Sequence, residues 1–144
     1  MGQVYFITGT DTGVGKTAIA TGLLRLAREQ ALSTLGLKPV SAGCEPVDGI
    51  WMNDDARELM LHSTVEPDYA TVNPVALREP MAPHIAAERE GRNISAAELI
   101  DHCRQQLAKA DFTIIEGAGG WLVPLDESQT MADFATRLGC PVIL

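Results

Sequence analysis

A lysine and a threonine with neighbours suited to phosphate chemistry lie near the start of the chain. Residues 9–17 read Gly-Thr-Asp-Thr-Gly-Val-Gly-Lys-Thr, between an apolar, β-branched run at 4–8 and a helical apolar pattern at 18–28. A glycine-bearing loop between a strand and a helix lets backbone N–H groups surround a phosphate, and the helix terminus adds positive charge. Lys16 would then meet the β- and γ-phosphates, and Thr17 would offer its hydroxyl to Mg²⁺. The pattern therefore predicts a phosphate-binding loop. The alternative is an ordinary strand-to-helix turn that carries a lysine.

Three further side chains have the chemistry that phosphoryl transfer needs. Lys38 stands near the C-terminal end of a strand predicted at 35–40, and Asp55 follows in the connection after it. Glu116 ends a buried strand predicted at 112–116 and precedes a glycine-rich run. Because ligands of open α/β sheets bind at the carboxyl ends of the strands, we expect these side chains beside the phosphate loop. A carboxylate at the position of Glu116 can hold Mg²⁺ directly or through water.

Each of these residues has a plainer alternative. Lys38 could be a surface lysine whose aliphatic stem lies along the protein. We predict instead that Lys16 and Lys38 are solvent-facing groups of a site. Asp55 could simply cap its helix, and Glu116 could be a surface carboxylate. For His84 we expect local packing or hydrogen bonding rather than catalysis.

The elements expected around these residues alternate between strands and helices. Strands are predicted at 4–8, 35–40 and 112–116, with a last one beginning at 140–144, and helices at 18–28, 53–61, 83–89, 95–109 and 130–138. A loop of small residues is predicted at 41–46. Residues 62–83, with four prolines, predict an irregular segment that is functional or covers a partner surface. The expected fold class is α/β, a mostly parallel sheet flanked by helices in the three-layer architecture of P-loop NTPases.

Composition limits the classes of partner and compartment. With 144 residues the chain is long enough for one domain, 1–144, and its net charge of −8 argues against a nucleic-acid binder. The three cysteines are far apart and match no zinc spacing, so reduced thiols in the cytoplasm are expected. No apolar run approaches a membrane span. Because the chain ends on the first residues of a predicted strand, we expect a longer protein whose C-terminal part is missing here.

Six motifs, taken together and in order, resemble the dethiobiotin synthetase family. The resemblance spans nearly the whole chain, and the combination is specific where any single motif is not. The motifs are Gly9-Thr10-Asp11-Thr12-x-Val14-Gly15-Lys16-Thr17, Lys38-Pro39-Val40, Asn53-x-Asp55-Ala56, Tyr69-Ala70-Thr71-x-Asn73-Pro74, Pro83-His84 and Glu116-Gly117-Ala118-Gly119-Gly120-Trp121.

The resemblance implies an ATP- and Mg²⁺-dependent ring closure in biotin synthesis, carried out by a homodimer. CO₂ adds to an amine of 7,8-diaminopelargonic acid to give a carbamate, and ATP phosphorylates the carbamate to a carbamic-phosphoric anhydride. The second amine then displaces phosphate and closes the cyclic urea of dethiobiotin. Family members continue further, so the chain resembles their N-terminal two thirds or so. In them, adenine recognition and part of the substrate-carboxylate pocket come from beyond the position of Leu144.

The same resemblance implies roles for individual residues. Lys16 and Lys38 are the expected catalytic groups, Lys16 at the γ-phosphate and Lys38 beside the carbamate. The implied metal ligands are Thr17, Asp55 and Glu116. The implied ATP-binding residues are Gly13, Val14, Gly15, Lys16, Thr17, Asp55, Glu116, Gly117, Ala118 and Gly119. The implied substrate contacts are Thr12, Lys38 and Ser41, where some relatives carry the serine one residue later, at the position of Ala42.

Two other functions share the phosphate loop. One is a related amide-forming ligase of the cobyrinic acid amidase type, which carries a glutamine-hydrolysing domain downstream. The other is a nucleotide-operated switch like the partition and septum-site ATPases, whose loop has a lysine at the position of Asp11. The opposite charge at Asp11 argues against the switch, and the Tyr-Ala-Thr-x-Asn-Pro and Pro-His stretches favour the biotin enzyme.

Overall fold

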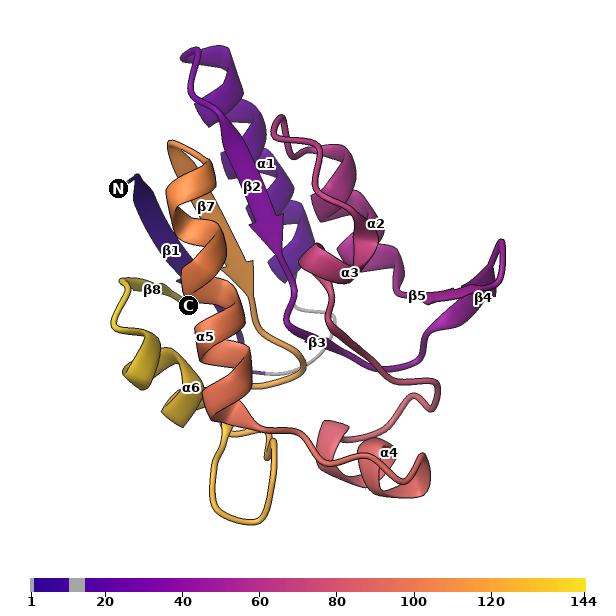
Figure 1. Cartoon of the computed structure of the whole chain (residues 1–144). Coiled ribbons are helices and arrows are strands. Elements are labelled where there is room, and N and C mark those ends of the chain that lie inside the picture. The colour runs from indigo at the N-terminus through magenta and orange to yellow at the C-terminus, as the bar shows by residue number, and fades with distance from the viewer. Residues whose placement is uncertain (1, 11–14) are drawn as a thin grey trace.

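A four-stranded parallel sheet forms the centre of the computed structural model, which describes residues 2–10 and 15–144. Its strands lie in the order β2-β7-β1-β8, so the third strand to join in sequence sits between the first two (Figure 1). Long crossover connections are what parallel pairing requires, and helices fill them here. The strands are β1 (Gln3–Ile7), β2 (Thr34–Leu37), β7 (Phe112–Glu116) and β8 (Val142–Ile143).

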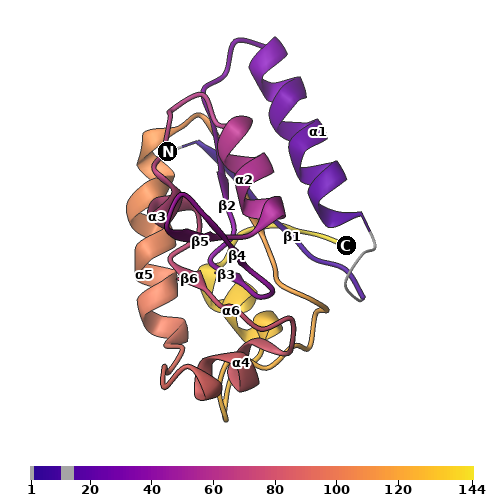
Figure 2. The ribbon, with the colours of Figure 1, turned by 90° about the vertical axis from the view of Figure 1, so that its right-hand side faces the viewer.

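Helices cover both faces of this sheet and complete three layers. In Figure 2, α1 and α5 stand on opposite sides of the strands. Residues of the first three helices share one apolar cluster with the sheet, and residues of the last three share another. The first three are α1 (Lys16–Glu29), α2 (Asp54–Leu61) and α3 (Tyr69–Val72). The last three are α4 (Pro83–Arg89), α5 (Ala96–Gln106) and α6 (Met131–Leu138), with a 3₁₀ turn at Leu107–Lys109 after α5. The expected α/β class and P-loop-type layering are confirmed.

The two apolar cores follow from the alternation of side chains along buried strands. In β1, Phe6 belongs to one cluster and Ile7 to the other, and in β7 Ile115 and Ile114 divide in the same way. A strand covered by helices on both faces must be apolar at successive positions, because neighbouring side chains point to opposite faces. This is why short continuous apolar runs in the sequence predict these strands correctly.

The predicted strand at 35–40 is wrong in its second half. β2 ends at Leu37, and Val40–Ser41 form a separate strand, β3, paired in parallel with β6 (Val75–Ala76). Pro39 has no N–H to give to a ladder, and the Lys38 N–H donates to the carbonyl of Val72, 2.8 Å away, instead of to the central sheet. The chain therefore leaves the sheet at Lys38, and this turn brings the lysine side chain to the sheet edge.

The predicted loop at 41–46 and the irregular segment at 62–83 also need correction. The first holds β3 and the beginning of a hairpin, β4 (Glu45–Val47) and β5 (Ile50–Met52), whose turn places Asp48 and Gly49 at φ 51° and 82°. Asp-Gly is a strong hairpin signal that the prediction overlooked. The second segment contains α3 and β6, so it is ordered around the site.

Within the described residues, no helix is both long enough and apolar enough to cross a membrane.

Candidate active site

The carboxyl ends of β2 and β7 and the start of α1 border the same cavity, of about 600 Å³. Its polar lining comes from three separate elements: the start of α1, the turn after β2 with the start of α2, and the end of β7. These polar residues are Lys16, Thr17, Lys38, Asn53, Asp55 and Glu116. The structure therefore brings together the main groups that the sequence placed at the sheet edge.

The first turn of α1 faces the end of β7. Gly15 caps the helix at φ 94°, a left-handed conformation that side chains disfavour, and so a glycine suits this position. The Lys16 ammonium donates to the carbonyl of Gly119 at 2.8 Å, and the Thr17 hydroxyl donates to Glu116 Oε1 at 2.7 Å. Lys16 and Thr17 are thus oriented toward the end of β7, which carries Glu116. The predicted contacts Thr12, Gly13 and Val14, like Asp11, lie outside the described residues.

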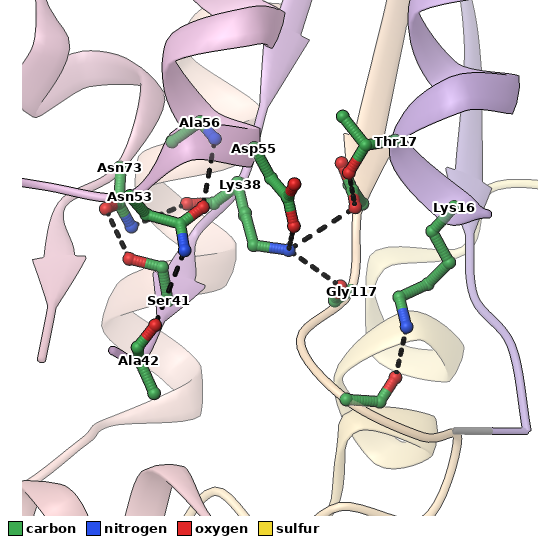
Figure 3. A network of polar contacts seen from close by, with 12 residues as sticks. Lys16, Thr17, Lys38, Ser41, Ala42, Asn53, Asp55, Ala56, Asn73 and Gly117 are labelled. Carbon is green, nitrogen blue, oxygen red and sulfur yellow. Dashed lines mark hydrogen bonds and ion pairs between the residues drawn. The ribbon is translucent and has the colours of Figure 1, made fainter. Parts of the chain in front are cut away.

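Lys38 is the centre of a buried charge cluster (Figure 3). Its ammonium lies 3.4 Å from Glu116 Oε1 and 3.7 Å from Asp55 Oδ2, and it donates to the carbonyl of Gly117 at 3.3 Å. The side chains of Lys38 and Glu116 are 6% and 0% exposed, whereas that of Asp55 is 47% exposed. The surface alternatives for Lys38 and Glu116 are therefore wrong. So is our expectation that Lys16 and Lys38 face solvent, because both are buried while lining the cavity.

The helix that carries Asp55 is capped by a different residue. Asn53 is the N-cap of α2, and its side-chain oxygen accepts from the N–H of Ala56 at 3.0 Å. An asparagine cap leaves Asp55 free to sit on the first turn with its carboxylate toward Lys38. The capping alternative for Asp55 is thus replaced by the ion pair.

Ser41 reaches the neighbourhood of the site, but its hydroxyl is engaged elsewhere. The residue is fully buried, and its Oγ donates to Asn73 Oδ1 at 2.6 Å and lies 3.2 Å from the Cys44 sulfur. Among the described residues that line the cavity, the neighbour Ala42 is present and Ser41 is not. The geometry therefore does not aim the Ser41 hydroxyl at a substrate in the cavity, because β3 turns it inward.

Trp121 and His84, each part of a motif of the resemblance, make none of the polar contacts described above. Trp121 packs edge-on against Phe6, with ring centroids 6.4 Å apart, as part of the core. His84 Nδ1 is buried and has no hydrogen-bond partner among the described residues. Among the described residues, His84 Nδ1 therefore does not make the local hydrogen bond that we expect.

Comparisons with known proteins identify the family to which the chain belongs. A family model described as "AAA domain" matches residues 3–144. The chain belongs to this AAA domain family. The chain is 54% identical over 142 residues to an "ATP-dependent dethiobiotin synthetase BioD" from Cellvibrio japonicus, covering 99% of this chain and 62% of that protein.

Other relatives of this AAA domain give the same picture. The proteins of the same printed name from Chromohalobacter salexigens and Pseudomonas paraeruginosa are 52% and 48% identical over 141 residues, 97% of this chain in each case. The chain covers 60% and 62% of their lengths, so it spans about three fifths of the curated relatives it matches. The resemblance to dethiobiotin synthetases that the motifs predicted is confirmed.

The AAA domain also offers oxygen groups that suit Mg²⁺. Both bonds to the Glu116 carboxylate fall on Oε1, and its buried Oε2 has no hydrogen-bond partner in the part of the chain that the structure describes. The Thr17 hydroxyl lies beside it, and Asp55 lines the same cavity. Within the described residues, no three His, Cys, Asp or Glu side chains gather into a complete metal site. Such a sparse oxygen set fits Mg²⁺, which keeps waters and phosphate oxygens as its other ligands.

Glu116→Gln tests whether Glu116 contributes to binding of Mg²⁺. The amide keeps the shape but loses the charge, so we expect the Mg²⁺ concentration needed for half-maximal effect to rise about 10-fold or more. The readouts are Mn²⁺ binding followed by electron paramagnetic resonance and the Mg²⁺ dependence of nucleotide binding. Glu29→Gln, at the exposed far end of α1, removes the same charge and serves as the control. Unchanged Mn²⁺ affinity in Glu116→Gln would remove Glu116 from the metal site.

Proposed function

We propose that the protein containing this chain is an ATP-dependent dethiobiotin synthetase that uses 7,8-diaminopelargonate and CO₂. The observation that carries the proposal is the meeting of Lys16 and Thr17 with Lys38, Asp55 and Glu116 around one cavity. A phosphate-loop lysine and threonine suit transfer of a γ-phosphoryl group. A second, buried lysine beside them suits a reaction in which another anion must approach the same phosphorus.

The reaction balances in three steps. An amine nitrogen of the substrate bonds to the carbon of CO₂ and loses a proton, giving a carbamate anion. A carbamate oxygen then bonds to the γ-phosphorus as the bond to the ADP oxygen breaks. Finally the second amine attacks the carbamoyl carbon, phosphate leaves with the bonding electrons, and a proton is lost as the cyclic urea forms. Phosphorylation is needed because a carbamate oxygen is otherwise a poor leaving group.

The described residues divide this work by position. Lys16, at the start of α1, neutralises the γ-phosphate, while Lys38 stabilises charge that moves between carbamate and phosphate. Thr17, Asp55 and Glu116 would hold Mg²⁺, which supplies charge neutralisation to the phosphates when bound.

Other contacts extend the proposal around this centre. We retain the Thr12 hydroxyl as a substrate contact and Gly13 and Val14 as phosphate contacts, with the backbone of Ala118 and Gly119 beside the nucleotide. Ser41 is retained only as a residue that supports this region, because its hydroxyl donates to Asn73.

The apolar part of the cavity supports the choice of substrate. Ala42, Pro80, Met81 and Val123 contribute to its lining. An aliphatic chain that ends in two amines would place its methylenes against such surface while the amines meet the charged groups. We also propose that the chain forms a single P-loop domain over 1–144 and acts in a homodimer whose further residues complete the adenine and carboxylate contacts.

Phosphate release by the complete gene product tests the proposed function. The assay contains ATP, Mg²⁺, bicarbonate and 7,8-diaminopelargonate, and each component is omitted in turn. We expect release that requires the diamine, together with a product of the mass of dethiobiotin. Release stimulated by glutamine would indicate the amidase-type ligase instead, and release that ignores the diamine but responds to a protein partner would indicate a nucleotide switch.

A further inference from the structure

The side chain of Asn73 is buried beneath the site and uses all of its hydrogen-bonding capacity. The residue is 2% exposed. Its amide nitrogen donates to the carbonyls of Lys38 and Val75, at 2.8 and 3.1 Å. Its amide oxygen accepts from the hydroxyls of Ser41 and Tyr69, at 2.6 and 2.8 Å. Two donors and two acceptor positions are the full capacity of an asparagine amide.

One branch of this network reaches the root of Lys38. The chain has just left the central sheet there, so the Lys38 carbonyl takes the Asn73 amide as a partner, and its N–H takes the Val72 carbonyl. Both backbone groups of Lys38 are thus fixed by the segment 72–73, at the end of α3. At the far end of the Lys38 side chain, the ammonium makes ion pairs with the carboxylates of Asp55 and Glu116 (Figure 3).

The other branch reaches the helix that carries Asp55. The Tyr69 hydroxyl donates to Asn73 and accepts from the backbone N–H of Asn53, at 2.7 Å. Asn53 is the N-cap of α2, and Asp55 lies two residues further along. The Tyr69 phenol has its pKa raised to about 12, chiefly by burial, so it keeps its proton and the donor role at neutral pH.

We infer that Asn73 and Tyr69 are positioning residues for the proposed reaction, which set the placement of Lys38 relative to Asp55 through one shared amide. The inference rests on the proposed function for its catalytic consequence. The structural part of the inference does not depend on that function. Lys38 and Asp55 form a 3.7 Å ion pair, and the same side-chain network binds the Lys38 carbonyl and the N–H of Asn53, the cap of the helix that carries Asp55. A misplacement of about 1 Å can cost about 100-fold in rate, so such seating matters to turnover.

Tyr69→Phe is the sharpest test, because it deletes one oxygen and keeps the ring. We expect kcat to fall about 10-fold or more, and the KM for ATP, to which Lys16 and Thr17 also contribute, to change less than kcat. Tyr5→Phe is the matched control. Tyr5 is the only other tyrosine of the chain and packs on Phe112 in the central sheet, and we expect it to leave kcat unchanged.

A double-mutant cycle separates positioning from general loosening of the fold. If Tyr69 acts by placing Asp55, the kcat losses of Tyr69→Phe and Asp55→Asn will combine to less than their product. Multiplicative losses, or a Tyr69→Phe effect confined to the KM for ATP, would overturn the inference. Ser41→Ala removes the other hydroxyl from the same amide oxygen and tests the amide again should Tyr69→Phe not fold.

A spectroscopic measurement keeps the inference testable without the proposed reaction. In protein with ¹³C-labelled lysine, the Lys38 side-chain signal is identified by its loss in Lys38→Met. We expect that signal to shift in Tyr69→Phe and in Asn73→Asp, and to stay in place in Tyr5→Phe. Asn73→Asp replaces the amide donor with a carboxylate oxygen, which repels the carbonyls of Lys38 and Val75. An unmoved Lys38 signal would refute the positioning role. A shifted signal in a protein that does not use the diamine would refute only the proposed function.

Discussion

Lys38→Met is expected to lower kcat about 1000-fold, the upper range for loss of one group that stabilises transition-state charge. Methionine keeps most of the volume of the lysine stem, so the variant removes the ammonium without opening a large cavity. The substitution takes away the cation that lies 3.4 Å from Glu116 Oε1. The predicted loss is therefore in the chemical step, with nucleotide binding retained through Lys16.

The same variant is expected to be less stable than wild type. Glu116 is fully buried, and removing the cation of a buried pair costs about 3 kcal/mol, whereas the half-exposed Asp55 adds little. Urea unfolding measures this, and saturating Mg²⁺ with nucleotide should recover part of the loss. Lys109→Met, at an exposed lysine, is the control for charge and side-chain type. Wild-type turnover in Lys38→Met would exclude Lys38 from catalysis.

The positions of Lys16, Thr17 and Glu116 could be predicted because their signals are local. A short apolar run gives the strand, glycines and a helical pattern give the turn and helix that follow, and parallel strands share a carboxyl edge. Those rules place the phosphate loop opposite the end of β7 without knowledge of any contact. The structure then supplies what they lack, namely the 2.7 Å bond from Thr17 to Glu116.

The burial of Lys38 could not be predicted in the same way. Its sequence neighbours suggest a strand end open to solvent, and only the packing of distant segments encloses it. Asp55 and Glu116 come from different elements, and their charges make a buried lysine tolerable. The rule that ligands bind at the carboxyl edge brings positions 38, 55 and 116 to one end of the sheet, but it does not give the burial of Lys38 or its two ion pairs.

The network around Asn73 was missed for a related reason. The Asn-Pro pair and its neighbouring prolines predict an irregular segment, and the structure corrects this with a short helix, α3, and a two-residue strand, β6. Buried irregular backbone must find hydrogen-bond partners, and Asn73 supplies them to Lys38 and Val75. Ser41, for which the resemblance implies a substrate contact, instead donates its hydroxyl to this amide.

Lys16→Met is expected to abolish turnover by a different route, through the nucleotide. Lys16 begins α1, and we propose that its ammonium and the N-terminal N–H groups of the helix together bind a phosphate of ATP. Its loss should therefore weaken binding of ATP with Mg²⁺ and lower kcat about 1000-fold. Isothermal titration with ATP and Mg²⁺ separates this from Lys38→Met, which should still bind nucleotide.

The control for Lys16→Met is Arg25→Met, which removes a positive charge from the exposed side of the same helix. It should bind ATP as wild type does, because general attraction by net charge is weak at physiological ionic strength. In this proposal the two lysines have different roles. Lys16 contributes to nucleotide affinity and neutralises the γ-phosphate, whereas Lys38 stabilises the carbamate that attacks it. Nucleotide affinity lost equally in Lys16→Met and Lys38→Met would show that they serve one phosphate site, and the second lysine would no longer argue for a carbamate.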